Sequence, residues 1–339
     1  MTGTVVVRTG TSVALLIVTF SLLWSCAPKT AGPPEKVTIA VSRNPNACLV
    51  HIASSKNYFV EEGLAVTLHP CTHGKAALEA MLEGKADIGT VGDTPITLAA
   101  IEGKPIRVLA AIMDSDRDTV IVGRKDRGIS RPADLKGKRI AVTRGTTGDF
   151  FLNSFLTTHG IATRDVSAVD LVPGGLEEAL IAGKVDAAST WNPHAIRLRS
   201  ALGEGAVTFF SETIYPQAFG LVSTRDYIGR KPEVIPKVLR ALIRAETFQR
   251  ENPDRSQGIV ADAIGTDKDL IRKIWPFYNF RVTLDQSLII NMENQARWAI
   301  GSRMTEKRQF PNFLQFIHPD CLVTVKPEAV TVIRQEGRP

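Results

Sequence analysis

The chain has 339 residues, of which 44% are hydrophobic and 22% charged, enough for two domains of ordinary size. Lysine and arginine outnumber aspartate and glutamate by 41 to 35, giving a formal net charge of +6. Because these charges form no basic block, the composition argues against a nucleic-acid-binding protein and suits an anionic ligand or surface.

The first 25 residues predict an export signal that is not part of the fold. Arg8 precedes an apolar run over residues 13–24, which is shorter than a typical membrane-spanning helix. Residues 23–26 (LWSC) resemble the bacterial lipobox, although Trp24 is bulkier than usual there. The resemblance implies cleavage before Cys26, a lipid on its thiol and a polar tether over residues 26–35. A plain signal anchor, or secretion without a lipid, is the alternative.

Downstream, short apolar strands alternate with amphipathic helices. The expected strands cover residues 36–41, 66–69, 86–90, 106–111, 119–122 and 138–143. The expected helices cover residues 76–82, a segment opened by Thr94 and Pro95, and residues 149–160. From Pro232 onward the chain becomes helical, and this tail is expected to pack on the first lobe over residues 233–249, 269–278 and 284–300. The alternation predicts an α/β fold with mostly parallel sheets flanked by helices.

An internal repeat indicates that the fold contains two similar halves. Residues 79–87 (EAMLEGKAD) and 178–186 (EALIAGKVD) share five of nine positions. Each copy is typical of a helix, a Gly-Lys break and a following strand. The repeat therefore supports two α/β lobes, with chance similarity between common units as the alternative.

Several segments, taken in order, resemble the extracytoplasmic binding proteins for nitrate, sulfonates, taurine and thiamine precursors. The matching segments are residues 58–59 and 63–64, 82–89 (LEGKADIG), 133–142 (ADLKGKRIAV), 183–187 (GKVDA) and 326–330 (KPEAV). The resemblance implies the type II periplasmic-binding-protein fold, whose two lobes close on a ligand. It places the first lobe at residues 36–122 plus 225–335 and the second at 123–224. The expected crossovers are residues 121–124 and 221–224.

The same resemblance implies a monomeric lipoprotein of the cell envelope that captures a small polar or anionic molecule, such as nitrate, a sulfonate or taurine. It would deliver this ligand to the permease and ATPase of an ABC transporter. No enzyme activity, cofactor, metal or nucleic-acid partner is expected. The motifs do not identify the ligand, and a sensor built from the same lobes is an alternative.

Two loops are expected to face each other across the ligand cleft, where strands end and helices begin. The loop at residues 92–95 contains Asp93, whose carboxylate would repel an anion unless it turned away. The loop at 144–149 contains Arg144, which could pair with an anion. Either loop could instead serve only as a helix start. Together with aromatic and amide side chains at neighbouring strand ends, the candidate ligand-binding residues are Asn46, Asp93, Thr94, Arg144, Gly145, Thr146, Thr147, Trp191 and Tyr215.

After Cys26, the cysteines are Cys48, Cys71 and Cys321, so at most one internal disulfide can form. A disulfide between Cys48 and Cys71 is expected, because both follow strands and the compartment is oxidising. Free thiols, or a soft-metal site completed by a histidine such as His73, are the alternatives. Cys48 also supports an enzyme alternative, because desulfinases of this fold carry a cysteine nucleophile in the same loop. Their Arg-X-Gly-Gly stretch is missing here.

Overall fold

The computed structural model describes residues 1–6, 32–210 and 214–333. The chain divides into two units, residues 1–34 and 35–339, and the described helices and strands all belong to the second. The apolar run of the expected signal peptide, the lipid-bearing Cys26 and most of the tether lie outside the described residues. Within the described part of the chain, no helix is long and apolar enough to span a membrane.

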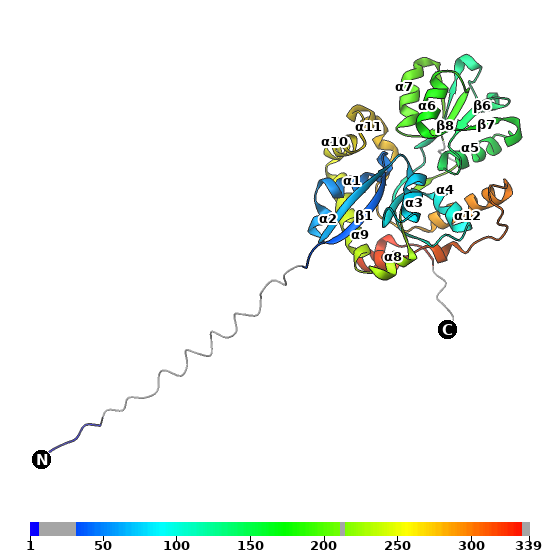
Figure 1. Cartoon of the computed structure of the whole chain (residues 1–339). Helices are drawn as coiled ribbons and strands as arrows, with labels where there is room; N and C mark the ends of the chain where they lie inside the picture. The colour runs from blue at the N-terminus through cyan, green and yellow to red at the C-terminus, as the bar shows by residue number, and fades with distance from the viewer. Residues whose placement is uncertain (7–31, 211–213, 334–339) are drawn as a thin grey trace. The chain divides into compact units, whose positions relative to one another are not determined.

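The first lobe is built on a five-stranded sheet with the order β2-β1-β3-β10-β4 (Figure 1). β1 pairs in parallel with β2 and β3, whereas β10 is antiparallel to both β3 and β4. Helices α3 and α4 follow β2 and β3 directly. The bounds are β1 (Glu35–Ser42), α1 (Cys48–Ser55), α2 (Tyr58–Glu61), β2 (Leu64–Cys71), α3 (Gly74–Leu82), β3 (Ile88–Gly92), α4 (Asp93–Ile101), β4 (Ile106–Ser115), β10 (Gln217–Thr224) and α8 (Arg225–Arg230).

The second lobe repeats this plan in a sheet with the order β7-β6-β8-β5-β9. β6 pairs in parallel with β7 and β8, and β5 is antiparallel to β8 and β9. The bounds are β5 (Thr119–Arg124), β6 (Arg139–Val142), α5 (Thr147–Thr158), β7 (Ser167–Asp170), α6 (Pro173–Ile181), β8 (Ala187–Trp191), α7 (His194–Leu202) and β9 (Ala206–Phe210). The repeated sequence covers the end of α3 and the turn before β3 in one lobe, and the end of α6 and the turn before β8 in the other. The expected two-lobed α/β architecture is thus confirmed.

The chain crosses between the sheets earlier than expected. It enters the second sheet through residues 116–118 and returns to the first between β9 and β10. The strands expected to form the crossovers, β5 and β10, each pair on both sides within one sheet. The lobe boundaries therefore shift from residues 122 and 224 to about residues 118 and 216. A short apolar run has the same appearance in a crossover and in a central strand.

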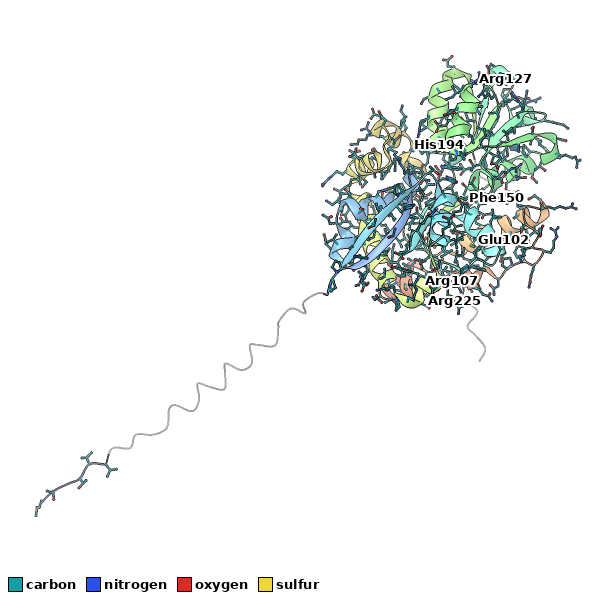
Figure 2. The ribbon with its side chains drawn as sticks, viewed as in Figure 1. Glu102, Arg107, Arg127, Phe150, His194 and Arg225 are labelled. Atoms are coloured by element: carbon teal, nitrogen blue, oxygen red, sulfur yellow. The ribbon has the colours of Figure 1, made fainter. Side chains whose placement is uncertain are left out.

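The lobes also touch through aromatic side chains. Phe150, in α5, lies where the second lobe meets the first (Figure 2). Its ring makes edge-on contacts with Tyr215, 4.9 Å away between centroids, and with Trp298, 5.3 Å away. Tyr215 lies just before β10 and Trp298 lies on α12 (Gln286–Gly301). Phe150 therefore connects the second lobe to both the return crossover and the helical tail.

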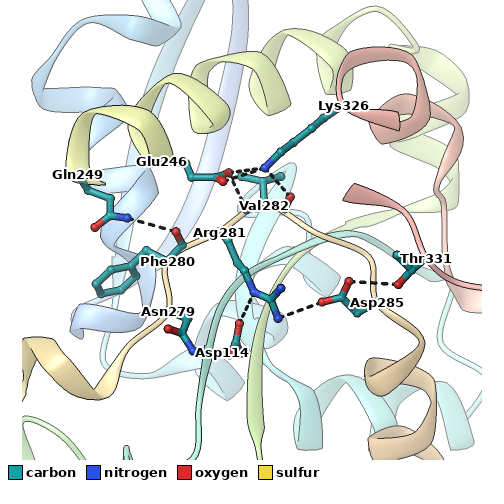
Figure 3. Close-up of polar contacts among 10 residues, drawn as sticks. All are labelled: Asp114, Glu246, Gln249, Asn279, Phe280, Arg281, Val282, Asp285, Lys326 and Thr331. Carbon is teal, nitrogen blue, oxygen red and sulfur yellow. Dashed lines mark hydrogen bonds and ion pairs between the residues drawn. The ribbon is translucent and has the colours of Figure 1, made fainter. Parts of the chain in front are cut away.

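The C-terminal helices share one hydrophobic core with the first sheet, as expected. Their bounds are α9 (Val234–Glu251), α10 (Pro253–Ile264), α11 (Lys268–Ile274), α12 (Gln286–Gly301) and α13 (Asp320–Val325). A segment before α12 lies along β4, where Thr283 bridges to Ala111 and Asn279 to Asp114. Arg281 donates to Asp114 over 2.7 Å, and Lys326 bonds Glu246 over 2.8 Å nearby (Figure 3). The Arg281 pair joins the tail to the sheet, and the Lys326 pair joins two parts of the tail to each other.

The expected disulfide between Cys48 and Cys71 is absent, and both cysteines are free thiols. Cys71 shares a small core cluster with Ala40, whereas Cys48 lies in the large cluster with Val41. Because Ala40 and Val41 are adjacent in β1, they face opposite sides of the sheet. The two thiols are therefore separated by the sheet. The described residues also contain no cluster of three or more potential metal ligands.

Candidate binding site

A pocket of about 20 Å³ lies between the two lobes. This volume holds about one water molecule, so the two lobes lie close together around the pocket. Most of its lining comes from the first lobe, and α5 and β8 supply the part from the second. The lining residues are Asn44, Asn46, His73, Gly74, Lys75, Gly92, Pro95, Thr146, Thr147, Trp191, Gln217 and Phe219.

Three helices begin at this pocket. α3 starts at Gly74, and α4 and α5 follow the N-cap residues Gly92 and Thr146. The carboxyl ends of parallel strands lie at the same edge of a sheet, so the helices that follow these strands begin at that edge. The first amides of a helix lack partners within it and lie at the positive end of the helix dipole. The pocket thus gathers the features of an anion site from both lobes.

Close backbone approaches bring the helix starts together. A β-carbon on Gly74 would lie 2.9 Å from the backbone nitrogen of Gly92 and 3.1 Å from the Phe219 ring. A β-carbon on Gly92 would lie 3.2 Å from the methyl group of Thr147 in the other lobe. Glycine at these two positions therefore allows α3, α4 and α5 to meet around one small space.

The lining carries one permanently charged side chain, Lys75, and contains no carboxylate. Lys75 Nζ donates to the backbone oxygen of Arg144 over 3.1 Å, which joins the first lobe to the second. Burial, together with repulsion from Lys75, lowers the pKa of His73 to about 4. His73 is therefore neutral at pH 7, and Lys75 supplies the positive charge of the pocket.

Three of the expected ligand residues, Asp93, Thr94 and Tyr215, lie behind the lining. Asp93 is fully buried and accepts hydrogen bonds from the Tyr215 hydroxyl, the Ala218 amide over 3.1 Å and the Thr94 amide over 2.9 Å. Burial raises the pKa of Asp93 to about 6, although these bonds oppose the increase. Its carboxylate turns away from the pocket, so it does not present a charge to an anion there.

Arg144 and Gly145 are not part of the lining either. The Arg144 guanidinium donates to the buried Asp149 over 2.9 Å, and the Gly145 amide donates to the other Asp149 oxygen over 3.0 Å. Asp149, in the first turn of α5, needs these partners because it has no exposure to water. The loop that was expected to bind an anion through Arg144 instead uses the Arg144 side chain and the Gly145 amide to bind Asp149.

The pocket does bring together four of the candidate residues, Asn46, Thr146, Thr147 and Trp191. Sequence reasoning missed Lys75, although the signal was present. Lys75 lies at the start of a helix that follows a strand, which is the rule that selected Thr94 and Thr146. The sequence indicated His73 as a possible metal ligand beside the cysteines or a partner of Cys48, and not as a lining residue of the pocket.

A family model described as NMT1/THI5 like matches residues 44–256, more than half of the chain. The chain belongs to this family. The taurine-binding periplasmic protein of Escherichia coli K12 is 29% identical over 225 residues, which cover 65% of the NMT1/THI5-like chain and 69% of the relative.

Solved structures confirm the fold. The alkanesulfonate-binding protein SsuA of Xanthomonas axonopodis pv. citri, bound to MOPS, superposes with a TM-score of 0.74 at 21% identity. The alignment covers 85% of the NMT1/THI5-like chain and 99% of SsuA. The nitrate-binding protein NrtA of Synechocystis PCC 6803 gives a TM-score of 0.72 at 12% identity, covering 87% and 89%.

The desulfurization enzyme DSZB shares the fold at 17% identity and a TM-score of 0.63, covering 87% of this chain and 99% of the enzyme. The enzyme alternative requires an accessible cysteine. Cys48 is fully buried in α1 and does not line the pocket, and burial raises the pKa of its thiol. A nucleophile needs the thiolate, which this environment disfavours. The comparisons agree with a binding protein and not an enzyme.

Proposed function

We propose that this chain is an extracytoplasmic solute-binding protein that captures a small sulfonate or similar oxyanion and passes it to an ABC importer. One observation carries the proposal: three helix N-termini and Lys75 meet in a small pocket whose lining contains no carboxylate. The taurine-, alkanesulfonate- and nitrate-binding proteins that it resembles support the same ligand class.

Ligand capture proceeds by closure of the lobes. An anion held by α3 and α4 of the first lobe gains the amides of α5 only when the second lobe is near. The contact of Lys75 with the Arg144 backbone oxygen and the proximity of Gly92 to Thr147 are available only in that closed arrangement. Bound ligand therefore favours closure, and the closed form is the one that docks on the permease.

The charge of Lys75 gives a direct test. Lys75→Ala is expected to weaken taurine or ethanesulfonate binding at least about tenfold, because a charged hydrogen bond in a buried pocket is lost. Arg144→Ala should have a smaller effect, because its guanidinium is already bonded to Asp149. Isothermal titration calorimetry measures both variants.

Lys104→Ala is the matched control, since Lys104 is an exposed lysine outside the pocket. Its affinity should equal that of the parent protein. Unchanged sulfonate affinity in Lys75→Ala would contradict the proposed site. A loss in Arg144→Ala as large as that in Lys75→Ala would instead return the anion site to the loop predicted from the sequence.

We also propose that the protein is held at the membrane by a diacylglycerol on Cys26, with residues 26–34, which precede β1, as the tether. The lipobox-like sequence supports this attachment. Cys26→Ala is expected to abolish incorporation of radiolabelled palmitate and to move the protein from the membrane fraction. Cys321→Ala is the control and should leave both unchanged. Equal labelling in Cys26→Ala would exclude the anchor.

A further inference from the structure

Asn46 is a lining residue of the pocket whose buried side-chain oxygen has no hydrogen-bond donor among the described residues. It lies in a short 3-10 helix (Pro45–Ala47), is 1% exposed and lines the pocket. Its Nδ2 donates to Asp118 Oδ2 over 3.0 Å. A carboxylate can only accept here, so the Asn46 amide must turn its NH₂ toward Asp118 and its Oδ1 away. No described residue donates to that buried Oδ1.

Asp118 fixes this orientation from the crossover between the lobes. It is fully buried, and its Oδ1 accepts from the Tyr278 hydroxyl over 2.7 Å and from the backbone N–H of Asn192 over 3.2 Å. Asn46 fills Oδ2. Asn192 directly follows Trp191 of the pocket lining. Asp118 therefore connects Asn46 in the first lobe with the strand end of the second.

The other amide side chains of the lining are already used differently. The Asn44 carbonyl accepts from the Ser42 hydroxyl over 3.0 Å, and the Gln217 carbonyl accepts from the Thr119 hydroxyl. Asn46 thus supplies the one side-chain amide carbonyl of the described lining that remains unfilled. A plain anion leaves this carbonyl unpaired, which is costly in a buried site, whereas a ligand N–H satisfies it.

We propose that Asn46 Oδ1, oriented by Asp118, accepts a hydrogen bond from an amine on the ligand. The site then selects an amine-bearing sulfonate over the same sulfonate without the amine. This inference rests on the proposed function and narrows its ligand class to zwitterions. The helix N-termini and Lys75 bind the anionic end, and Asn46 binds the amine. Asp118 is a positioning residue that does not itself touch the ligand.

Taurine and ethanesulfonate form a matched pair of probes that differ by the amine. Calorimetry on the full protein is expected to show taurine binding at least about tenfold more tightly. Asn46→Ala should reduce this preference to near unity. Thr147→Val, which alters a hydroxyl at the start of α5, is the control and should weaken both ligands while keeping their ratio.

Asp118→Asn separates orientation from simple packing. In the parent protein, Asp118 Oδ1 accepts from two donors, Tyr278 and Asn192, and Oδ2 accepts from Asn46 alone. An asparagine at position 118 therefore keeps its side-chain oxygen toward Tyr278 and Asn192. Its NH₂ group then lies toward Asn46. Asn46 must then rotate its carbonyl toward residue 118 and its NH₂ away. The preference for taurine is expected to fall below one, which a packing defect would not cause. Thermal unfolding confirms that each variant is folded.

The outcomes distinguish this inference from the proposal beneath it. A parent protein that binds neither sulfonate nor nitrate overturns the proposed function, and this inference with it; one that binds only nitrate overturns this inference alone. A parent that binds both sulfonates equally, or a folded Asn46→Ala that keeps the parent's preference, overturns this inference alone. If Asp118→Asn does not fold, the Asn46→Ala ratio still decides the question.

Discussion

Replacing Phe150 with alanine is expected to lower the free energy of unfolding by about 3–5 kcal/mol. The ring is 7% exposed and makes edge-on contacts with Tyr215 and Trp298. Its loss leaves a cavity at the junction of the lobes that the surrounding rings cannot fill without moving. Urea denaturation followed by circular dichroism measures the change.

Phe150→Ala should also weaken ligand binding, because its contacts join α5 to the first lobe and so stabilise the closed arrangement. Phe155→Ala is the matched control. Phe155 is also buried in α5, but its ring contacts Phe151, His159 and Phe209 within the second lobe. It should lose comparable stability and retain more affinity. Equal losses of affinity in the two variants would exclude a special role for the interlobe contact.

The second large effect concerns Asp93 and pH. Its pKa is about 6 in the folded protein against an ordinary value of 3.8. Between these values the folded protein keeps a proton that the unfolded chain has released. The contribution of Asp93 to stability is therefore fully present below pH 3.8 and is lost as the pH rises through 6. The loss amounts to about 3 kcal/mol, from a shift of about two pKa units.

Comparison with Asp93→Asn isolates this contribution. The asparagine does not titrate, so between pH 4 and pH 7 the parent should lose most of this contribution, about 2 kcal/mol, relative to the variant. The difference between the two proteins is the useful quantity, since burial lowers the pKa of His51 and His73 to about 4 and acts in the opposite direction. Urea denaturation at several pH values measures it. Parallel pH profiles would show that Asp93 does not titrate in this range.

The general position of the site could be predicted from the sequence, whereas the individual contacts could not. Helix starts that follow strands identified Thr146 and Thr147, and the repeated strand identified Trp191. The pairing of Asp93 with Tyr215 joins residues 122 positions apart, and no local pattern indicates it. Arg144 and Asp149 are five residues apart, and their ion pair could have been considered. A buried carboxylate is stabilised by pairing with a cation, and Arg144 pairs with the buried Asp149. For this reason Arg144 does not line the pocket.

In the fold, too, features that depend on local patterns could be predicted from the sequence, whereas contacts between distant residues could not. Alternating strands and helices predicted two α/β lobes, because that pattern depends on local periodicity. The assignment of β5 and β10 failed because sheet membership depends on partners distant in the sequence. The cysteine pairing failed for a related reason. Cys71 ends β2 and Cys48 begins α1, but only the sheet reveals that the two thiols lie on opposite sides of it.

The fastening of the C-terminal segment along β4 has a consequence for solubility at high concentration. A strand at the border of a sheet exposes backbone donors and acceptors that can recruit a strand from another molecule. Here β4 borders the first sheet, and its outer side is covered by bridges from Asn279, Thr283 and Ile317. Arg281 holds this segment against β4 through Asp114, and Lys326 donates to the backbone oxygen of Val282 in the same segment. The cover protects this border against edge-to-edge aggregation.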